Sequence, residues 1–316
     1  MIDLIIPAYN AEDTIGRALG SVVAQTRPRK FLVTVIDDCS TDATEAIVKK
    51  FKGLLPLQYI KLEKNLGRPG LVRNVGIERT NCPYIMFLDA DDILAPNAGE
   101  VLSRAILQNK PDFISSSFYQ DTQDDVYNII KYTALTWLHG NIYSRNFLEE
   151  KNIMFDNKMN EDGSFNLKCF WMSKNKATMG QPMSYWLNNK NSLTRKNNNF
   201  MLDIANDYIK TYNDAIYMVI KNDITLIKDN DFIKTCAYKA AEFIQLFEGL
   251  LGANRDTSFA DAFIQEYIDF MKSINMINKN FIILMNRHFN RYEILPDIMR
   301  QHTLTYYIDK FNIKGE

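Results

Sequence analysis

Residues 84–92 of the chain read YIMFLDADD, an apolar run that ends at Leu88 and is followed by Asp89, Asp91 and Asp92. Carboxylates this close together repel one another and raise each other's pKa unless a cation neutralises them. Hard oxygen ligands of this kind suit Mg²⁺ or Mn²⁺, which would in turn bridge a diphosphate. The alternative is a solvated acidic turn, but the position directly after a predicted buried strand favours a functional site.

The first hundred or so residues alternate short β runs with helical runs. The β runs lie at 4–6, 31–36, 57–62 and 84–88, and the helical spacings lie at 14–23, about 41–51 and 70–80. Thr41 is the expected N-cap of the second helix, with Glu45 in its first turn. Strands separated by helices of this length predict βαβ units and a parallel sheet, whose ligands bind at the carboxyl ends of the strands.

The rest of the chain changes character twice. Residues 112–195 mix polar and aromatic residues, and after Phe200 the apolar spacing is purely helical. Apolar stripes there, such as Tyr208, Tyr212 and Ala215, are expected to form a core. The sequence therefore predicts an α/β protein with a C-terminal all-helical extension.

Composition is that of a folded protein, with 46% hydrophobic residues, 24% charged residues and a net charge of -1. These values exclude disorder and a uniformly basic nucleic-acid coat. No apolar window reaches the ~18 residues of a membrane span, and the N-terminus reads as a strand and not as a signal peptide. The 4 cysteines contain no C-x-x-C pair, so free thiols and a cytoplasmic location are expected.

Two further segments carry polar groups near the predicted edge. Residues 35–42 read VIDDCSTD, where one carboxylate could accept the imide N–H of a pyrimidine; helix capping is the alternative, and both can hold at different residues. Residues 65–76 read NLGRPGLVRNVG. Gly67 and Gly70 would allow close backbone approach there, and Arg73 suits phosphate oxygens.

Together these segments resemble the nucleotide-sugar domain of family 2 glycosyltransferases with the GT-A fold. The matching stretches are IIPAYNA at 5–11, IDDCSTD at 36–42, NLG at 65–67 with RNVG at 73–76, and FLDADD at 87–92. One departure is Cys39, where the family more often has Gly, and we expect it to alter loop packing more than chemistry. The resemblance covers about residues 1–195.

The resemblance implies a GT-A, Rossmann-like, mostly parallel sheet and three parts. Residues 1–115 would form the nucleotide-sugar-binding half of the GT-A domain, and residues 116–196 its acceptor-binding and catalytic half. Residues 197–316 would form a helical C-terminal domain without a motif of the family.

The resemblance also implies roles for donor-site residues. Asp38 would bind the uracil edge, Asp89 would face the ribose or the metal, and Asp91 would hold Mn²⁺ or Mg²⁺ on the diphosphate. Asp89 and Asp91 are thus the expected metal ligands. The expected donor-binding residues are Pro7, Ala8, Tyr9, Asp38, Gly67, Arg73, Asp89, Ala90 and, in a loop that closes over the donor in relatives, Arg195.

Glu161 and Asp162 look like the E-D motif of the family, which makes Asp162 the expected catalytic base. A sugar hydroxyl is a poor nucleophile until a positioned carboxylate takes its proton in the transition state. Helix capping by Asp162 is the alternative. The expected acceptor or cleft residues are Trp137, His139, Glu161 and Trp186; His139 could touch phosphate, metal or acceptor, or be structural.

The predicted function is an inverting, metal-dependent glycosyltransferase that moves a sugar from a UDP-sugar to an acceptor hydroxyl. Two other classes stay open, a nucleotidyltransferase and a non-catalytic sugar-nucleotide-binding module. The expected acceptor is a glycan. The alternative is hydroxymethylcytosine in DNA, as for a phage enzyme, with residues such as Arg68 or Trp137 contacting the nucleic acid.

Overall fold

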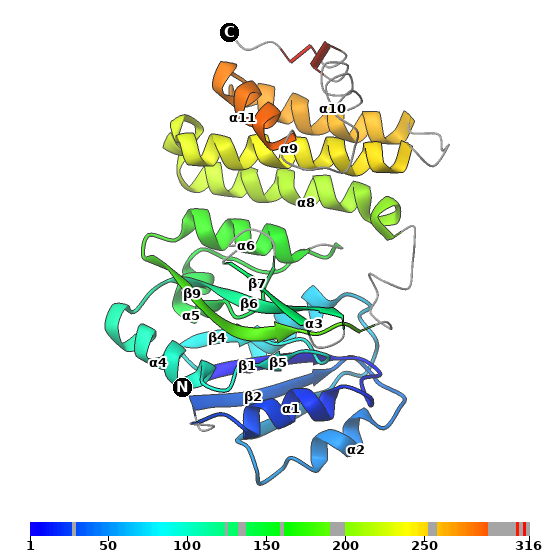
Figure 1. Ribbon diagram of the computed structural model, residues 1–316, viewed down its shortest axis with the longest axis vertical. Helices are drawn as coiled ribbons and strands as arrows, with labels where there is room; N and C mark the ends of the chain where they lie inside the picture. The colour runs from blue at the N-terminus through cyan, green and yellow to red at the C-terminus, as the bar shows by residue number, and fades with distance from the viewer. Residues whose placement is uncertain are drawn as a thin grey trace. The chain divides into compact units, whose positions relative to one another are not determined.

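The computed structural model describes residues 1–26, 30–123, 126–131, 137–158, 161–189, 200–251, 258–289, 308–309 and 312–313. The chain divides into two compact units, Met1–Lys196 and Asn197–Glu316. The first unit combines a sheet with helices, and the elements described in the second are helical (Figure 1).

The first half of the N-terminal unit contains the predicted alternation of strands and helices. The elements are β1 (Ile2–Ala8), α1 (Ile15–Val23), β2 (Phe31–Asp37), α2 (Thr44–Lys49), β3 (Leu57–Lys61), α3 (Pro69–Arg79), β4 (Tyr84–Phe87), β5 (Ile93–Leu94) and α4 (Ala98–Asn109). The second half contains β6 (Phe113–Gln123), β7 (Val126–Ile130), β8 (Ile142–Ser144), α5 (Arg145–Glu150), α6 (Glu161–Met172) and β9 (Lys176–Trp186).

Nine strands of the described residues form one sheet in the order β3-β2-β1-β4-β8-β6-β9-β5, with β7 paired to β6. The first four strands in this order are parallel, as the sequence predicts. The second half is mixed, because β8 runs antiparallel to β4 and β6 while β9 runs parallel to β6. The sheet is thus a parallel βαβ half extended by a mixed half.

The register places three polar segments at one edge of the sheet. Ala8 at the end of β1 pairs with Asp37 at the end of β2, and Ile5 pairs with Phe87 at the end of β4. Because these strands are parallel, the residues that follow them emerge on the same side. Tyr9, Asp38 and Asp89 therefore share the edge predicted from the sequence.

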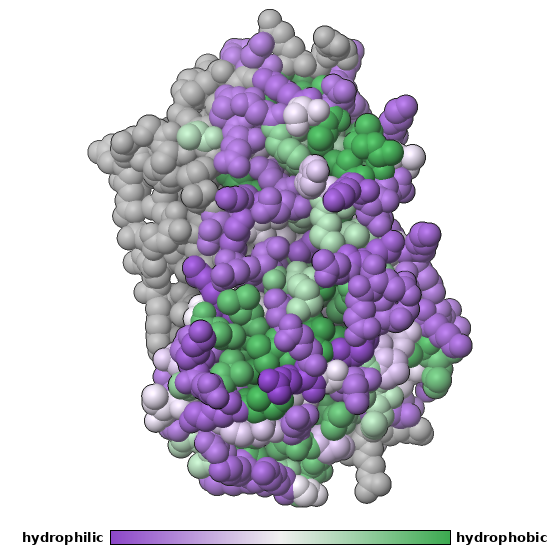
Figure 2. All heavy atoms as spheres, turned by 180° about the vertical axis from the view of Figure 1, so that it is seen from behind, coloured by the Kyte–Doolittle hydropathy of each residue, from purple (hydrophilic) through white to green (hydrophobic). Residues whose placement is uncertain are grey.

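Alternating side chains of β1 bury apolar groups on both faces of the sheet. Leu4 and Ile6 are fully buried and belong to a core cluster that includes residues of α1 and α4. On the other face, Gly76 brings α3 against β1, since a Cβ at that position would lie 2.4 Å from Cγ2 of Ile5. Figure 2 shows that hydrophilic side chains cover most of the described surface seen from behind, with hydrophobic side chains gathered in patches among them.

The second predicted helix begins later than expected, at Thr44 with Ala43 before it, so the prediction of Thr41 as its N-cap is wrong. The cause is a set of side chains that satisfy the backbone N–H groups of this segment. Asn10 Oδ1 accepts from the Thr41 N–H at 2.9 Å, and a carboxylate oxygen of Glu12 accepts from the Ala43 N–H at 2.8 Å. These bonds hold the segment as a loop against the turn after β1.

The C-terminal unit consists of helices in its described part. They are α8 (Phe200–Asn222), the 3₁₀ helix η2 (Ile224–Lys228), α9 (Asn230–Leu251), α10 (Ser258–Ser273) and α11 (Lys279–Phe289). Tyr212, Phe243 and Tyr267 come from three of these helices and are buried together, with ring centroids of Phe243 and Tyr267 5.0 Å apart. Among the described residues, no helix is both long enough and apolar enough to cross a bilayer.

Candidate active site

Asp38 lies at the carboxyl end of β2 and ties two loops together. Its carboxylate accepts hydrogen bonds from the backbone N–H of Leu66 at 2.7 Å and of Gly67 at 3.2 Å. Its own N–H donates to the carbonyl of Ala8 at 2.8 Å. Gly67 has a φ of 68°, which glycine adopts without strain. The loop that follows β3 is thereby fixed beside the ends of β1 and β2.

The neighbouring residues leave an open surface at the same edge. Tyr9, which follows β1, has 54% of its surface exposed, so its ring is available to a ligand. Cys39 has a φ of 66°, in the left-handed region that favours glycine. Glycine adopts this conformation without strain, which explains why a glycine suits the position.

Arg73 on α3 gathers three carboxylates. Its Nη2 lies 2.7 Å from Oδ1 of Asp89, after β4. Its Nη1 lies 3.0 Å from Oε1 of Glu161 and 3.0 Å from Oδ1 of Asp162, at the start of α6. The structure thus brings the expected donor-site aspartate and the expected base to the same guanidinium group.

The charges of this cluster shift its pKa values in different directions. Burial opposes ionisation of Asp89, but the charges of Arg73 and His139 and the hydrogen bond from Arg73 together outweigh burial and hold the pKa of Asp89 below its usual value. Burial raises the pKa of Asp162, and burial together with the charge of Asp162 raises the pKa of Glu161 to about 7. A carboxylate with a raised pKa is a better proton acceptor, which suits a general base.

Asp91 lies close to Asp89, in the segment that follows the carboxyl end of β4. Its Oδ2 accepts a hydrogen bond from Nδ2 of Asn189 at 2.8 Å, and its backbone carbonyl accepts from Nη2 of Arg17 at 3.1 Å. Burial and the nearby charge of Asp89 raise the pKa of Asp91. A bound cation would remove this electrostatic cost.

The carboxylates at this site can be compared with the ligands that a divalent ion requires. Within the described ranges no three His, Cys, Asp or Glu side chains form a metal-binding group. The side chain of Asp89 is nevertheless 37% exposed, and Asp91 stands next to it in the DxD segment. Mg²⁺ is commonly held by one or two carboxylates, water and substrate phosphates. Asp89 and Asp91 therefore fit an ion that arrives with a diphosphate.

Asp92, the third acid of the triplet, faces the protein interior. It is 1% exposed, its Oδ1 accepts from the Leu187 N–H at 2.9 Å, and its Oδ2 lies 3.2 Å from Nδ1 of His139. Burial would lower the pKa of His139, but the hydrogen bond and charge of Asp92 raise it. Asp92 thus anchors His139 and the end of β9.

His139 belongs to an aromatic cluster that includes two other expected cleft residues. Its ring stacks on Trp186 with centroids 5.5 Å apart, and Trp137 lies 6.0 Å from Trp186. Phe118 on β6 contacts all three rings. The cluster forms one apolar wall next to the acidic residues.

The structure thus places most of the expected residues in three groups, and the residues within each group contact one another. Asp38 and Gly67 form the first, Arg73, Asp89, Glu161 and Asp162 the second, and Trp137, His139 and Trp186 the third. Ala90 follows Asp89 within the DxD segment, Pro7 and Ala8 end β1, and Arg195 lies outside the described residues. Sequence reasoning missed Arg17 and Asn189, which contact Asp91, because neither lies in a motif.

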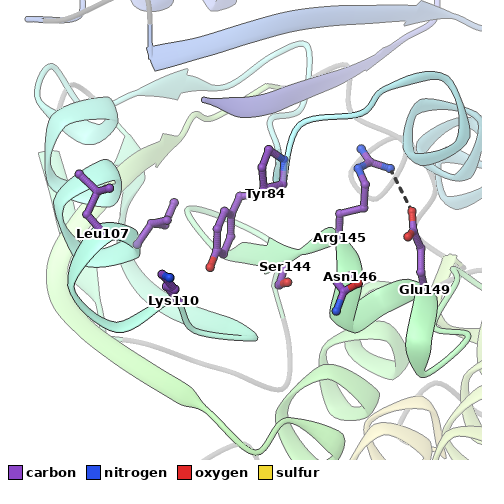
Figure 3. Close-up of a pocket in the computed structure, with 9 residues that line it drawn as sticks. Tyr84, Leu107, Lys110, Ser144, Arg145, Asn146 and Glu149 are labelled. Carbon is purple, nitrogen blue, oxygen red and sulfur yellow. Dashed lines mark ion pairs between the residues drawn. The ribbon is translucent and has the colours of Figure 1, made fainter.

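A cavity of about 490 Å³ opens elsewhere in the N-terminal unit (Figure 3). Its lining includes Tyr84, Lys110, Arg145 and Glu149, and an ion pair of 3.9 Å joins the last two. Tyr84 begins β4, whereas Asp89 follows its end, so this cavity lies at the opposite edge of the sheet from the acidic residues. It contains none of the expected site residues.

A curved sheet with parallel βαβ units and an acidic DxD segment at its carboxyl edge is typical of nucleotide-sugar-dependent transferases. The family model described as Glycosyl transferase family 2 matches residues 3–166. The chain belongs to this family, as the four sequence segments predict.

Curated relatives resemble somewhat more than half of the chain. Poly(ribitol-phosphate) beta-N-acetylglucosaminyltransferase TarS of Staphylococcus aureus is 28% identical over 198 residues, which cover 58% of this chain and 34% of TarS. Poly(ribitol-phosphate) beta-glucosyltransferase of Bacillus spizizenii is 27% identical over 202 residues, which cover 59% of this chain and 32% of that enzyme. The matched part spans about a third of the length of these relatives.

Solved structures confirm the GT-A fold. A crystal structure of S. aureus TarS with UDP-GlcNAc aligns with a TM-score of 0.64 at 19% identity, covering 99% of this chain and 88% of that one. The mannosyltransferase PcManGT of Pyrobaculum calidifontis, in complex with GDP-Man and Mn²⁺, aligns with a TM-score of 0.54 at 14% identity, covering 98% and 86%.

Proposed function

We propose that this chain is an inverting, metal-dependent glycosyltransferase that moves a sugar from a UDP-sugar to a hydroxyl group of a glycan. The single observation that carries the proposal is the geometry around Arg73, which holds donor-edge Asp89 and α6 residue Asp162 at 2.7 and 3.0 Å. A glycosyltransferase needs its catalytic base close to the place where the diphosphate leaves. In this cluster Asp162 would be the base, and Asp89 would lie on the side of the diphosphate.

The donor would lie across the carboxyl ends of β1, β2 and β4. Exposed Tyr9, with Pro7 and Ala8, would border the base, and Asp38 beside Gly67 would accept the imide N–H of uracil. A carboxylate can accept more than two hydrogen bonds, so the backbone bonds that Asp38 already accepts leave capacity for the base. UDP-sugar use is supported by the TarS complex with UDP-GlcNAc.

Asp162 would act as the general base in a single displacement. As the acceptor oxygen bonds to the anomeric carbon, the bond from that carbon to the diphosphate oxygen breaks. Asp162 takes the proton of the acceptor hydroxyl, and UDP departs with the electron pair of the broken bond. Its side chain is 29% exposed, so an acceptor can reach it.

Asp89 and Asp91 would hold the divalent ion. A bound Mn²⁺ or Mg²⁺ supplies positive charge that stabilises the departing diphosphate. The guanidinium of Arg17 donates a hydrogen bond to the backbone carbonyl of Asp91. Arg17 would therefore add positive charge near the phosphates. The Mn²⁺ in the PcManGT complex supports this proposal by likeness of fold.

The names of two relatives support a glycan acceptor. Both name poly(ribitol-phosphate), with N-acetylglucosamine in one case and glucose in the other as the sugar transferred. The alternative of modified DNA finds no support in them. The Trp137, His139 and Trp186 cluster would line the acceptor side, since aromatic rings pack well against the C–H faces of sugars.

Incubation with a panel of UDP-, GDP- and TDP-sugars, with and without Mn²⁺, tests the proposal through release of the nucleoside diphosphate. We expect release from a UDP-sugar that requires the metal and increases with a polyol-phosphate or glycan acceptor. Nucleotide binding without release under all conditions would identify a binding module instead. Pyrophosphate release from UTP and a sugar phosphate would identify a nucleotidyltransferase.

A further inference from the structure

Arg73 is a buried arginine whose side chain is 4% exposed and engaged on both terminal nitrogens. Nη2 contacts Asp89, while Nη1 is shared by Glu161 and Asp162. Its guanidinium carbon also lies 5.5 Å from the ring centre of Phe155. The hydrogen bonds to these carboxylates engage three of the five N–H donors of a guanidinium, and the buried Nε lacks an acceptor among the described residues. A guanidinium held in this way has little capacity left for a substrate phosphate.

The position of Arg73 is fixed by close packing of α3. At Gly70, a Cβ would lie 2.6 Å from Cγ of Glu161, so only glycine lets the start of α3 approach α6 this closely. Asn74, the next residue after Arg73, exchanges two hydrogen bonds of 2.9 Å with the backbone of Phe155. The helix that carries Arg73 is therefore held against both segments that flank the candidate base.

Charge explains why an arginine suits this place. Three carboxylates surround one cation, and a carboxylate that loses its cationic partner is driven towards the protonated form or away from its neighbours. A guanidinium has several donors in a rigid plane and can hold groups in two directions, whereas an ammonium is a point charge. Lysine at position 73 would keep a charge without spanning Asp89 and Asp162 together.

We infer that Arg73 is a positioning residue, which orients the carboxylate of Asp162 relative to Asp89 and does not itself bind the diphosphate of the donor. This inference rests on the proposed function and deepens it. It differs from the role expected for Arg73 by resemblance, where the side chain would lie in the donor-binding set. The effect of changing Arg73 should therefore appear in the chemical step and not in donor affinity.

The test compares Arg73→Lys with Arg145→Lys. Arg145 is a matched control, because it is also a partly buried arginine, with 12% side-chain exposure, paired with a buried aspartate, Asp3, at 3.0 Å. We expect Arg73→Lys to lower kcat about 10²-fold, the scale of a misplaced catalytic group. KM for the UDP-sugar and the Kd of UDP, measured by calorimetry, should change less than about twofold. Arg145→Lys should lower thermal stability and leave kcat unchanged.

A double-mutant cycle tests whether Arg73 acts through Asp162. If Arg73 acts through Asp162, the variant Arg73→Lys/Asp162→Asn should be about as slow as Asp162→Asn alone. If Arg73→Lys does not fold, Arg73→Gln takes its place in the same cycle.

Three results would overturn the inference. Losses that multiply in the double variant would mean that Arg73 acts separately from Asp162. A rise in the Kd of UDP that accounts for the whole loss of kcat/KM would make Arg73 a donor ligand. A fall in stability with unchanged kcat, as in Arg145→Lys, would make it structural. Failure of the proposed function is distinguishable, because the wild-type chain would then release no UDP.

Discussion

The buried charges of the two units differ in how far apart their partners lie along the chain. In the N-terminal unit, Arg73 pairs with carboxylates that lie 16, 88 and 89 residues further on. In the C-terminal unit, Lys239 pairs with Glu242 of the same helix turn at 2.5 Å and lies 4.6 Å from the ring centre of Tyr212. The first arrangement joins separate segments, whereas the second supports one helix and its packing.

This contrast indicates where the chemistry lies. Burying charged groups costs free energy, so a cluster assembled from distant segments needs compensation by the rest of the fold. A local pair within a helix requires no such assembly. The proposed active site lies in the N-terminal unit, whereas the described part of the C-terminal unit has the features of a helical core. The predictions below test this division, beginning with the largest expected effect.

Replacement of Asp91 by Asn should reduce metal-dependent UDP release to background while leaving the fold intact. The substitution removes the negative charge that is proposed to hold the cation and keeps the size of the side chain. UDP release measures the activity, and thermal denaturation measures the stability of the fold. Asp13→Asn, an exposed acid in the same unit, is the control and should retain full activity. Full activity of Asp91→Asn, or of the wild type in EDTA, would contradict the metal assignment.

Replacement of Asp162 by Asn should lower kcat by ~10²-fold or more, the usual scale for a lost general base. The Kd of UDP should stay close to that of the wild type, because Asp162 is proposed to contact the acceptor. Steady-state kinetics and calorimetry measure these quantities, and Glu149→Gln, with a side chain 63% exposed, serves as control. A parallel loss of UDP affinity would make Asp162 part of the donor site.

Replacement of Phe243 by Ala should destabilise the C-terminal unit by about 3–5 kcal/mol, as for other buried aromatic residues. Phe243 is fully buried and packs against Tyr208, Tyr212 and Tyr267. The Kd of UDP should not change, since the expected donor site belongs to the other unit. Denaturation curves and UDP titration measure both effects, and Tyr217→Ala, at an exposed site, is the control. A loss of UDP affinity would show that the helical unit supports the donor site.

The smallest expected effect concerns the pH dependence of stability. Burial and the charge of Asp162 raise the pKa of Glu161 from 4.5 to about 7, so the folded state favours its protonated form. The stabilisation from this group is present below pH 4.5 and is lost as the pH rises towards 7. Glu161→Gln should therefore lose less thermal stability than the wild type between these values, measured by calorimetry in EDTA.

Glu45→Gln provides a control of opposite sign. A hydrogen bond with Lys49 holds the pKa of Glu45 below its usual value of 4.5. Its contribution is present above that pH and is lost as the pH falls, so this variant should follow the wild type between pH 4.5 and 7. Identical profiles of Glu161→Gln and the wild type would contradict the raised pKa of Glu161.

Much of the N-terminal fold could be predicted from local patterns. The apolar runs at 4–6, 31–36, 57–62 and 84–88 lie in β1, β2, β3 and β4, with boundaries within a few residues. Strand and helix periods are properties of neighbouring residues, so a sequence reports them directly. The start of α2 was missed because its loop is held by Asn10 and Glu12, more than thirty residues earlier.

The amino-acid sequence by itself determined the order of strands and helices in residues 1–88, the DxD segment at a strand end and the membership in a glycosyltransferase family. The tertiary structure alone decided which partner each acid contacts, because these partners are distant in sequence. It turned Asp92 inwards to His139, left Asp89 partly exposed and joined it to Asp162 through Arg73. Charges and hydrogen bonds depend on distance in space, and no periodic pattern along the chain encodes contacts between residues 73, 89 and 162.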